Sequence, residues 1–170
     1  MLMFRSFRYI TACALLIALC QCKGKPAMPA GDKDNGGLAL PDGFEAVVVV
    51  DSIGPSRHLA IRDNGDVFVK LNISKGDKGS VALRDTDGDG KADQFNDFAK
   101  MDHPRGLIYD NGSLWVLHPP FLSVFHDVDR DGTSDKSEVL IEGISTDEVN
   151  KRGADHTTNG IRMGIDGWIY

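Results

Sequence analysis

The chain has 170 residues, a formal net charge of −6 at pH 7 and 8% aromatic residues, which is ordinary for one soluble domain with its own core. A nucleic-acid-binding surface needs clustered Lys and Arg, so the acidic balance argues against nucleic acid as a partner. Because the acidic residues are concentrated in two short Asp-rich segments, we interpret the negative charge as a local property of metal sites.

Residues 1–22 are expected to form an export signal of the bacterial lipoprotein type. Arg5 and Arg8 give the segment a positive start, and the apolar run that follows is short for a membrane span. Cys20 and Cys22 end this run, where a lipoprotein signal places the Cys that becomes lipidated. We expect the protein in the periplasm or at the outer membrane, held to the membrane by a lipid anchor. Plain secretion and an uncleaved anchor are the alternatives.

The remainder divides into a linker and a domain. Residues 23–38 are rich in Gly, Pro, Ala and Lys and lack apolar periodicity, which predicts a flexible linker. The folded domain is expected over residues 39–170, and the β-branched run at 44–50 predicts its first strand. No Cys follows Cys22, so this domain has no internal disulfide and depends on core packing or on a metal.

One pattern recurs three times in the domain, at residues 59–69, 106–116 and 160–170. It consists of an apolar strand, an Asn-Gly or Asp-Gly turn, and a strand with an aromatic residue. Both dipeptides favour two-residue hairpins, because each turn position accepts a positive φ. The turn glycines lie 47 and 55 residues apart, a period typical of four-stranded propeller blades. The predicted fold class is all-β, an incomplete β-propeller of about two to three blades; an irregular β-sandwich is the alternative.

A second repeat, with the pattern Asp-x-Asp-x-Asp-Gly, begins at Asp85 and again 42 residues later. Its second copy matches the twelve-residue calcium loop, in which alternate carboxylates, a backbone carbonyl and a final Glu converge on the ion. The candidate ligands of the second copy are Asp127, Asp129, Asp131, the backbone carbonyl of Thr133, Asp135 and Glu138. Those of the first copy are Asp85, Asp87, Asp89, the backbone carbonyl of Lys91, and Asp93.

The two copies are not equal. Position 12 of the first copy is Asn96, which lacks the carboxylate that could close the site, so we expect it to bind Ca²⁺ more weakly. No helical pattern flanks either copy, so both are expected as loops between strands. Asp-Gly-rich turns without metal are the alternative.

The motifs LPDGFEAVVVVDS, AIRDNGDVFV, LRDTDGDGKAD, HPRGLIYDNGSLWV, DVDRDGTSDKSEVLIEG and DHTTNGIRMGIDGWIY follow one another in residues 41–170. Together they resemble the N-terminal propeller of the large exported bacterial membrane-bound dehydrogenase proteins. That propeller is similar in turn to the glucose/sorbosone dehydrogenases, which use pyrroloquinoline quinone (PQQ). The resemblance therefore implies a PQQ-dependent oxidoreductase acting on a sugar or an alcohol.

The resemblance also implies site residues and partners. His156 matches the general base that takes the proton of the sugar hydroxyl, and Asp155 matches the residue that positions it. The implied electron acceptor is a c-type cytochrome domain; since no Cys-x-x-Cys-His motif is present in this sequence, haem c is expected only in a domain outside it. A non-catalytic, calcium-stabilised propeller that binds carbohydrate or a partner protein is the alternative, with His156 as a hydrogen-bonded loop residue.

Overall fold

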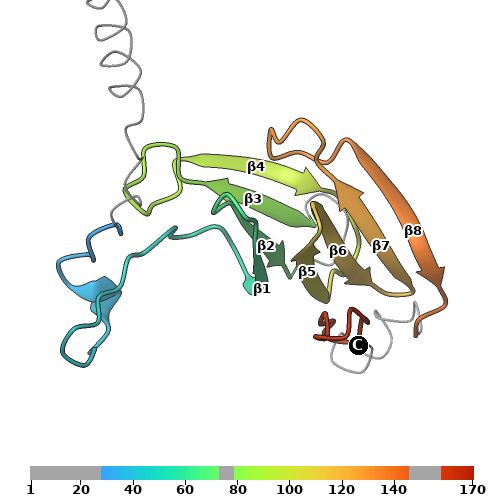
Figure 1. Cartoon of the computed structure of the whole chain (residues 1–170), viewed down its shortest axis with the longest axis horizontal. Coiled ribbons are helices and arrows are strands. Elements are labelled where there is room, and N and C mark those ends of the chain that lie inside the picture. The colour runs from blue at the N-terminus through green and yellow to red at the C-terminus, as the bar shows by residue number, and fades with distance from the viewer. Residues whose placement is uncertain (1–27, 73–78, 146–157) are drawn as a thin grey trace, which may run out of the picture.

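The structure, a computed structural model, describes residues 28–72, 79–145 and 158–170. In these ranges the chain is almost entirely β, with two four-stranded antiparallel sheets whose strands follow sequence order (Figure 1). Sheet 1 contains β1 (Ser56–Ile61), β2 (Val67–Leu71), β3 (Ser80–Arg84) and β4 (Gln94–Ala99). Sheet 2 contains β5 (Gly106–Asp110), β6 (Ser113–His118), β7 (Phe121–His126) and β8 (Lys136–Glu142). The prediction of an all-β fold is confirmed.

The two sheets are built alike. In each sheet a short hairpin joins the first and second strands, and an Asp-rich loop joins the third and fourth strands. The two repeats in the sequence are therefore halves of one four-stranded unit. Because antiparallel neighbours alternate in direction, the hairpin turns and the Asp-rich loops lie at the same end of each sheet.

The turns differ from one another. Asn111 and Gly112, with φ of 46° and 81°, form the predicted two-residue turn between β5 and β6. Between β1 and β2 the turn has three residues, so the prediction is wrong there. The Arg62 N–H donates to the Asp66 carbonyl at 2.9 Å, and Gly65 takes the positive φ of 96° that closes such a turn.

A third hairpin begins at residue 158. Met163 and Ile169 form an isolated bridge, and the Gly164 N–H donates to the Trp168 carbonyl at 2.8 Å, which again makes a three-residue turn. This hairpin lies against the start of β5, since a Cβ atom on Gly106 would lie 2.6 Å from the backbone nitrogen of Ile161. Strand β5 contacts β1 in turn, so the first strands of successive units are neighbours.

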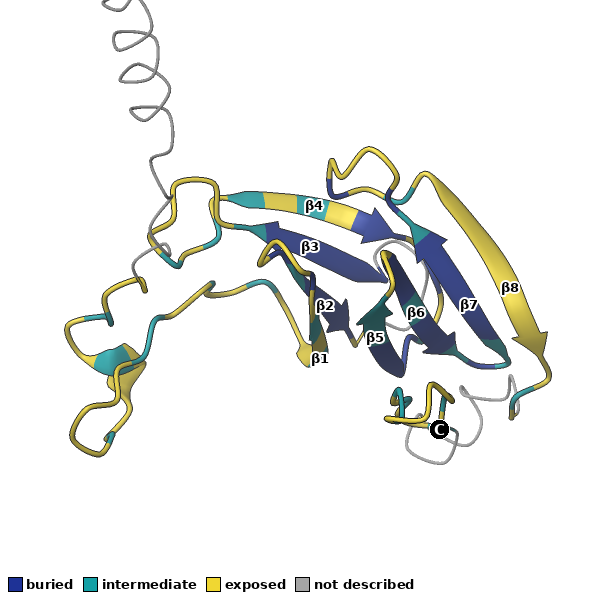
Figure 2. Ribbon diagram, viewed as in Figure 1, coloured by how far each residue is buried: buried dark blue, intermediate teal, exposed yellow. Residues whose placement is uncertain are grey.

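The main core lies between the sheets, where their inner strands are buried (Figure 2). Phe68 of β2 packs edge-on against Phe98 of β4, with ring centroids 4.7 Å apart, and stacks on Tyr109 of β5 at 5.7 Å. The other buried members of this cluster are Ala82, Ala99, Met101, Leu107, Leu114, Val116 and Phe125. Burial of each large side chain stabilises the sheet contact by about 1.5–3 kcal/mol.

The N-terminal arm, residues 28–53, extends away from sheet 1 over most of its length and meets the sheet at its end (Figure 1). Residues 44–50 form no strand, contrary to the prediction from their β-branched run. Their backbone groups bond to a loop and to side chains instead of a ladder: the Val48 N–H donates to Asp32 Oδ2 at 2.7 Å. Val50 and Ile53 pack on a second buried cluster, formed by Val69, Leu71, Val81 and Leu83.

Part of the range expected as a linker also has local structure. A short 3-10 turn, η1 (Asn35–Gly37), lies in it, and the Gly31 N–H donates to the Glu45 carboxylate at 2.9 Å. The expected export signal, residues 1–22, lies outside the described residues. In the part of the chain that the structure describes, no helix has the length and apolar character of a membrane span.

The packing between the sheets predicts a contrast between two aromatic residues of β4. Phe98 is 2% exposed in the inter-sheet core, whereas Phe95 is 51% exposed. Phe98→Ala should lower the free energy of unfolding by about 3–5 kcal/mol, and the matched control Phe95→Ala should lower it by much less. Urea denaturation of the two variants measures the difference, and equal losses would show that the sheets are not held by this core.

Candidate metal-binding site

The two Asp-rich segments occupy equivalent places. Loop 1 (residues 85–93) joins β3 to β4, and loop 2 (residues 127–135) joins β7 to β8. In each loop three carboxylates gather, and one oxygen of each lies within 4.8 Å of the others. The groups are Asp85, Asp87 and Asp89 in loop 1, and Asp127, Asp129 and Asp135 in loop 2.

The loops also share their hydrogen bonds. The first Asp accepts from the N–H five residues later: Asp85 Oδ2 from Gly90 at 2.8 Å and Asp127 Oδ2 from Gly132 at 3.2 Å. Both glycines have a positive φ, of 87° and 91°, so the sharp turn requires Gly at this position. In both loops the last Asp accepts from the N–H of the second residue, at 3.1 Å and 2.7 Å. The two segments therefore form similar turns, which differ at Oδ1 of the first Asp: it accepts from the Gly88 N–H in loop 1 and from the Asp131 N–H in loop 2.

The remaining candidate ligands lie outside these groups of three. Asp131 Oδ1 accepts from the Thr133 N–H at 2.7 Å, and Asp93 Oδ2 accepts from the hydroxyl of Thr86 at 2.7 Å. Glu138 is exposed on β8, opposite Val124. The structure thus gathers six of the nine candidate carboxylates and leaves Asp93, Asp131 and Glu138 apart.

Loop 1 is attached to the N-terminal arm. The Lys91 ammonium lies 2.7 Å from Asp32, and this hydrogen bond holds the pKa of Asp32 below its usual value. The Ala92 N–H donates to the Val49 carbonyl at 2.8 Å. Within the loop, the N–H groups of Gly88 and Gly90 lower the pKa of Asp85, so this carboxylate is ionised over a wide pH range.

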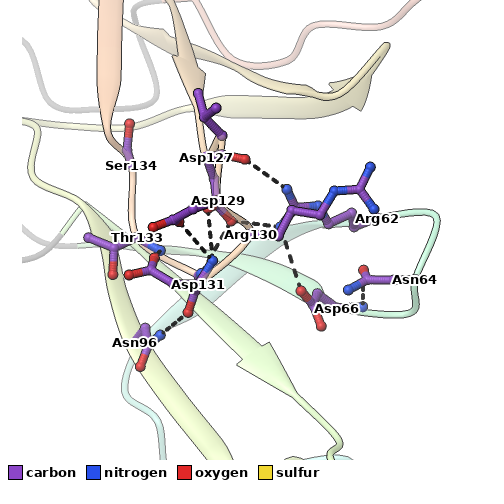
Figure 3. A network of polar contacts seen from close by, with 12 residues as sticks. Arg62, Asn64, Asp66, Asn96, Asp127, Asp129, Arg130, Asp131, Thr133 and Ser134 are labelled. Carbon is purple, nitrogen blue, oxygen red and sulfur yellow. Dashed lines mark hydrogen bonds and ion pairs between the residues drawn. The ribbon is translucent and has the colours of Figure 1, made fainter.

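Loop 2 is attached to sheet 1 through Arg62, which is 3% exposed (Figure 3). Its Nη1 lies 2.6 Å from Asp127 Oδ2, and its Nη2 donates to the Asp127 carbonyl at 3.2 Å. Its Nε donates to the Tyr109 hydroxyl at 3.3 Å, and the guanidinium lies against the rings of Phe68 and Tyr109. Burial alone would lower the pKa of Arg62, but the bonds to Asp127 and Tyr109 outweigh it and raise the pKa.

A second arginine extends this connection. Arg84, at the end of β3, bonds to both carboxylate oxygens of Asp66, at 2.9 and 2.6 Å, and donates to the Arg130 carbonyl of loop 2 at 2.8 Å. Burial would raise the pKa of Asp66, but the hydrogen bonds from Arg84 outweigh it, so the pKa lies below its usual value.

Strand β4 supplies the last contacts with loop 2. The Asn96 side-chain amide donates to the Asp131 carbonyl at 2.6 Å, and the Ser134 N–H donates to the Phe98 carbonyl at 2.9 Å. Asn96, which the calcium-loop pattern placed at position 12 of loop 1, therefore serves loop 2. Arg62, Arg84, Asn96 and β4 together hold loop 2 on sheet 1.

Sequence reasoning missed Arg62 and Arg84 as functional residues. The available signal was position: each is a charged residue that directly follows the apolar part of a strand and directly precedes an Asp. That signal does not name a partner, because Arg62 and Asp127 are 65 residues apart in the chain.

The candidate catalytic residues Asp155 and His156 lie outside the described residues. At the same end of the sheets as the segments that bound them, Lys70 and Arg105 are fully buried. Burial lowers the pKa of His58, a residue of β1 paired with Lys70 of β2, and that of His118, whose Nε2 lies 2.8 Å from the Ser123 hydroxyl. The hydrogen bond and the burial of His118 are typical of a structural residue.

Comparison with known proteins gives a family and a fold. The family described as Domain of unknown function (DUF7133) matches residues 66–170. A calcium structure of a Trichoderma reesei protein of the carbohydrate-active enzyme family AA12 matches with a TM-score of 0.56 and 14% identity, over 75% of this chain and 31% of that one. The chain thus spans about a third of that protein's length.

A second solved structure is a putative oxidoreductase from Thermus thermophilus that is described as a glucose dehydrogenase. It matches with a TM-score of 0.36 and 17% identity, over 67% of this chain and 38% of that one. No curated protein matches the chain.

The lowered pKa of Asp66 predicts how acid acts on the sheets. Since the folded pKa lies below the usual value of about 4, the ion pair with Arg84 stabilises the fold fully above that pH and is lost as the pH falls through the depressed pKa. Asp66→Asn should therefore be less stable than the wild type at pH 7, with the gap narrowing towards pH 3. Urea denaturation from pH 3 to 7 measures this. Asp63→Asn, in the same turn but exposed, is the control; a gap that is independent of pH would contradict the assignment.

Proposed function

The chain belongs to the family described as Domain of unknown function (DUF7133), and from this premise we propose that it is part of an exported, calcium-binding β-propeller oxidoreductase that acts on a sugar or an alcohol. The proposal has three parts, which are the propeller, the calcium loops and the redox activity. Each part has its own support.

The propeller is supported by the order of the first strands. Strand β1 contacts β5, and β5 lies against residues 160–161, so the two sheets and the third hairpin follow one another side by side. Four-stranded meanders arranged in this way are typical of propeller blades. The similarity in fold to the AA12 structure is in accord with this arrangement.

The calcium loops are supported by the chemistry of their ligands. Ca²⁺ is a hard cation that takes carboxylate and carbonyl oxygens, and each loop offers three carboxylates whose oxygens already converge. Carboxylates this close repel one another, and a divalent cation would remove the repulsion. The observation that carries the proposal is that the two turns share the hydrogen bonds to Oδ2 of their first and last Asp, between strands of otherwise different sequence. The AA12 neighbour is itself described as a calcium structure.

The redox activity is supported by the resemblance of residues 155–167 to quinone-dependent dehydrogenases. In this proposal His156 accepts the proton of the substrate hydroxyl, and Asp155 orients and supports the imidazole. A bound quinone such as PQQ would supply the hydride acceptor, and a c-type cytochrome domain the next electron acceptor. The residues that would hold the quinone are not assigned.

The alternative is a calcium-stabilised propeller that binds carbohydrate or a partner protein without redox chemistry. It shares the loops and the fold with the first proposal, but it has no quinone and no electron acceptor, and His156 is an ordinary loop residue in it. The two are separated by the activity experiment below.

If each loop binds one Ca²⁺ ion, a substitution in one loop should weaken Ca²⁺ binding at that loop alone. Asp87→Asn should weaken one Ca²⁺ site and Asp129→Asn the other, each by roughly tenfold or more, because each removes a converging charge. Isothermal titration of the whole chain with CaCl₂ measures both sites. Wild-type protein without any calcium heat or stabilisation would refute the calcium part.

Glu138 tests the predicted ranking of the loops. If it completes loop 2 when the ion binds, Glu138→Gln should weaken that site alone and reduce its advantage over loop 1. Glu142→Gln, on the same exposed strand, is the matched control. Unchanged affinity would mean that position 12 takes no part and that loop 2 closes with other ligands.

For the redox part, His156→Ala in the full-length protein should lower turnover by roughly a hundredfold or more, the usual contribution of a positioned base. Dye reduction with PQQ, Ca²⁺ and a panel of aldoses and alcohols measures turnover, and Ca²⁺ affinity serves as the control for folding. Activity that survives the mutation would remove His156 from the mechanism. A wild type that neither binds PQQ nor oxidises any substrate would favour the binding module.

A further inference from the structure

Loops 1 and 2 have similar turns, but they contact different parts of the molecule. Loop 1 contacts the N-terminal arm through Lys91 and Ala92. Loop 2 contacts the neighbouring sheet through Arg62, Arg84 and strand β4. A cation at loop 1 would therefore act on the arm, and a cation at loop 2 on the contact between the sheets.

We propose that loop 2 is a cation-dependent clamp between the two sheets, with Arg62 as the residue that positions its first ligand. This inference rests on the calcium binding proposed above. The cation and the inter-sheet contact stabilise each other through one shared side chain, Asp127, which is 5% exposed and belongs to both.

The two oxygens of Asp127 have different partners (Figure 3). Oδ2 accepts from Arg62 Nη1 at 2.6 Å and from the Gly132 N–H at 3.2 Å, which fills its two acceptor positions. Among the described residues, Oδ1 accepts only from the Asp131 N–H, at 3.0 Å, so it keeps one position for a cation. Arg62 thus presents Asp127 as a ligand through a single oxygen in a fixed direction.

A cation in loop 2 would in turn strengthen the contact between loop 2 and sheet 1. A cation that orders loop 2 also fixes the Asp131 carbonyl, which accepts from Asn96, and the Ser134 N–H, which donates to Phe98. Both of these partners belong to β4 of sheet 1. Coupling between two binding events is reciprocal, so Ca²⁺ must bind more tightly when the sheets are in contact, and the sheets must hold more tightly when Ca²⁺ is bound.

Two backbone amides report the two loops separately. The Ser134 N–H, bonded to Phe98, reports the contact of loop 2 with sheet 1, and the Ala92 N–H, bonded to Val49, reports the contact of loop 1 with the arm. We expect Ca²⁺ to slow hydrogen exchange at Ser134 by about tenfold, in line with typical coupling. Asp129→Asn should abolish this protection, and Asp87→Asn should leave it intact while abolishing that of Ala92.

Arg62→Lys tests the positioning role, because it keeps the charge but lacks the planar fork that bonds to Asp127 Oδ2, the Asp127 carbonyl and the Tyr109 hydroxyl at once. In an Asp87→Asn background, which leaves loop 2 as the site titrated with CaCl₂, the dissociation constant should rise about tenfold. Arg130→Lys, at an exposed position of loop 2, is the matched control and should leave it unchanged. If Arg62→Lys does not fold, Tyr109→Phe, which removes only the bond to Nε, should show a smaller rise.

The outcomes separate this inference from the calcium proposal. Ca²⁺ binding at loop 2 with unchanged Ser134 exchange, or with equal affinity in Arg62→Lys and Arg130→Lys, would overturn the clamp and leave the calcium proposal standing. Absence of Ca²⁺ binding at both loops would overturn both.

Discussion

A guanidinium group buried between two sheets has to be fully paired, and in this protein that requirement fixes how the units meet. An unpaired buried charge costs several kcal/mol, so removing one partner of such a pair is far more destabilising than the net worth of the pair. Arg62 satisfies the requirement with the carboxylate and carbonyl of Asp127, the hydroxyl of Tyr109, and two aromatic faces. All of these except Phe68 belong to sheet 2 or its loop, so sheet 2 can take only one register against sheet 1.

The apolar core and the ion pairs contribute differently to the contact between the sheets. Phe68, Phe98 and Leu114 supply the bulk of the favourable burial, but apolar contacts alone tolerate sliding. Arg62, at the hairpin end, adds hydrogen bonds of fixed geometry between the sheets. Arg84 adds another, to the backbone of loop 2. The two four-stranded sheets share the same sequence repeats but are not equivalent in the structure, because, among the described residues, loop 2 contacts a neighbouring sheet and loop 1 does not.

The sequence predicted the features that are local. The hairpins and the Asp-x-Asp-x-Asp-Gly loops follow from short-range turn chemistry, and their spacing predicted the four-stranded units. It failed where tertiary partners decide. Residues 44–50 have strand propensity, but their backbone groups bond to a loop and to side chains instead of a ladder. Arg62 was not given a role, because its partner Asp127 lies 65 residues away in the chain. The sequence pattern assigned Asn96 to loop 1, which precedes it in the chain, whereas in the structure its side chain bonds to loop 2.

The topology also separates the proposed metal loops from the other end of the sheets. Loops 1 and 2 lie at the hairpin end of the sheets, while the described residues on either side of Asp155 and His156, the end of β8 and the start of the third hairpin, lie at the opposite end. A six- or seven-residue strand separates the two ends by roughly 20 Å. Calcium in either loop would therefore be too far away to act directly on groups at that opposite end, such as the buried Lys70 and Arg105. Any effect of calcium there has to pass through the stability of the sheets, so calcium removal would act by lowering the folded fraction of the protein.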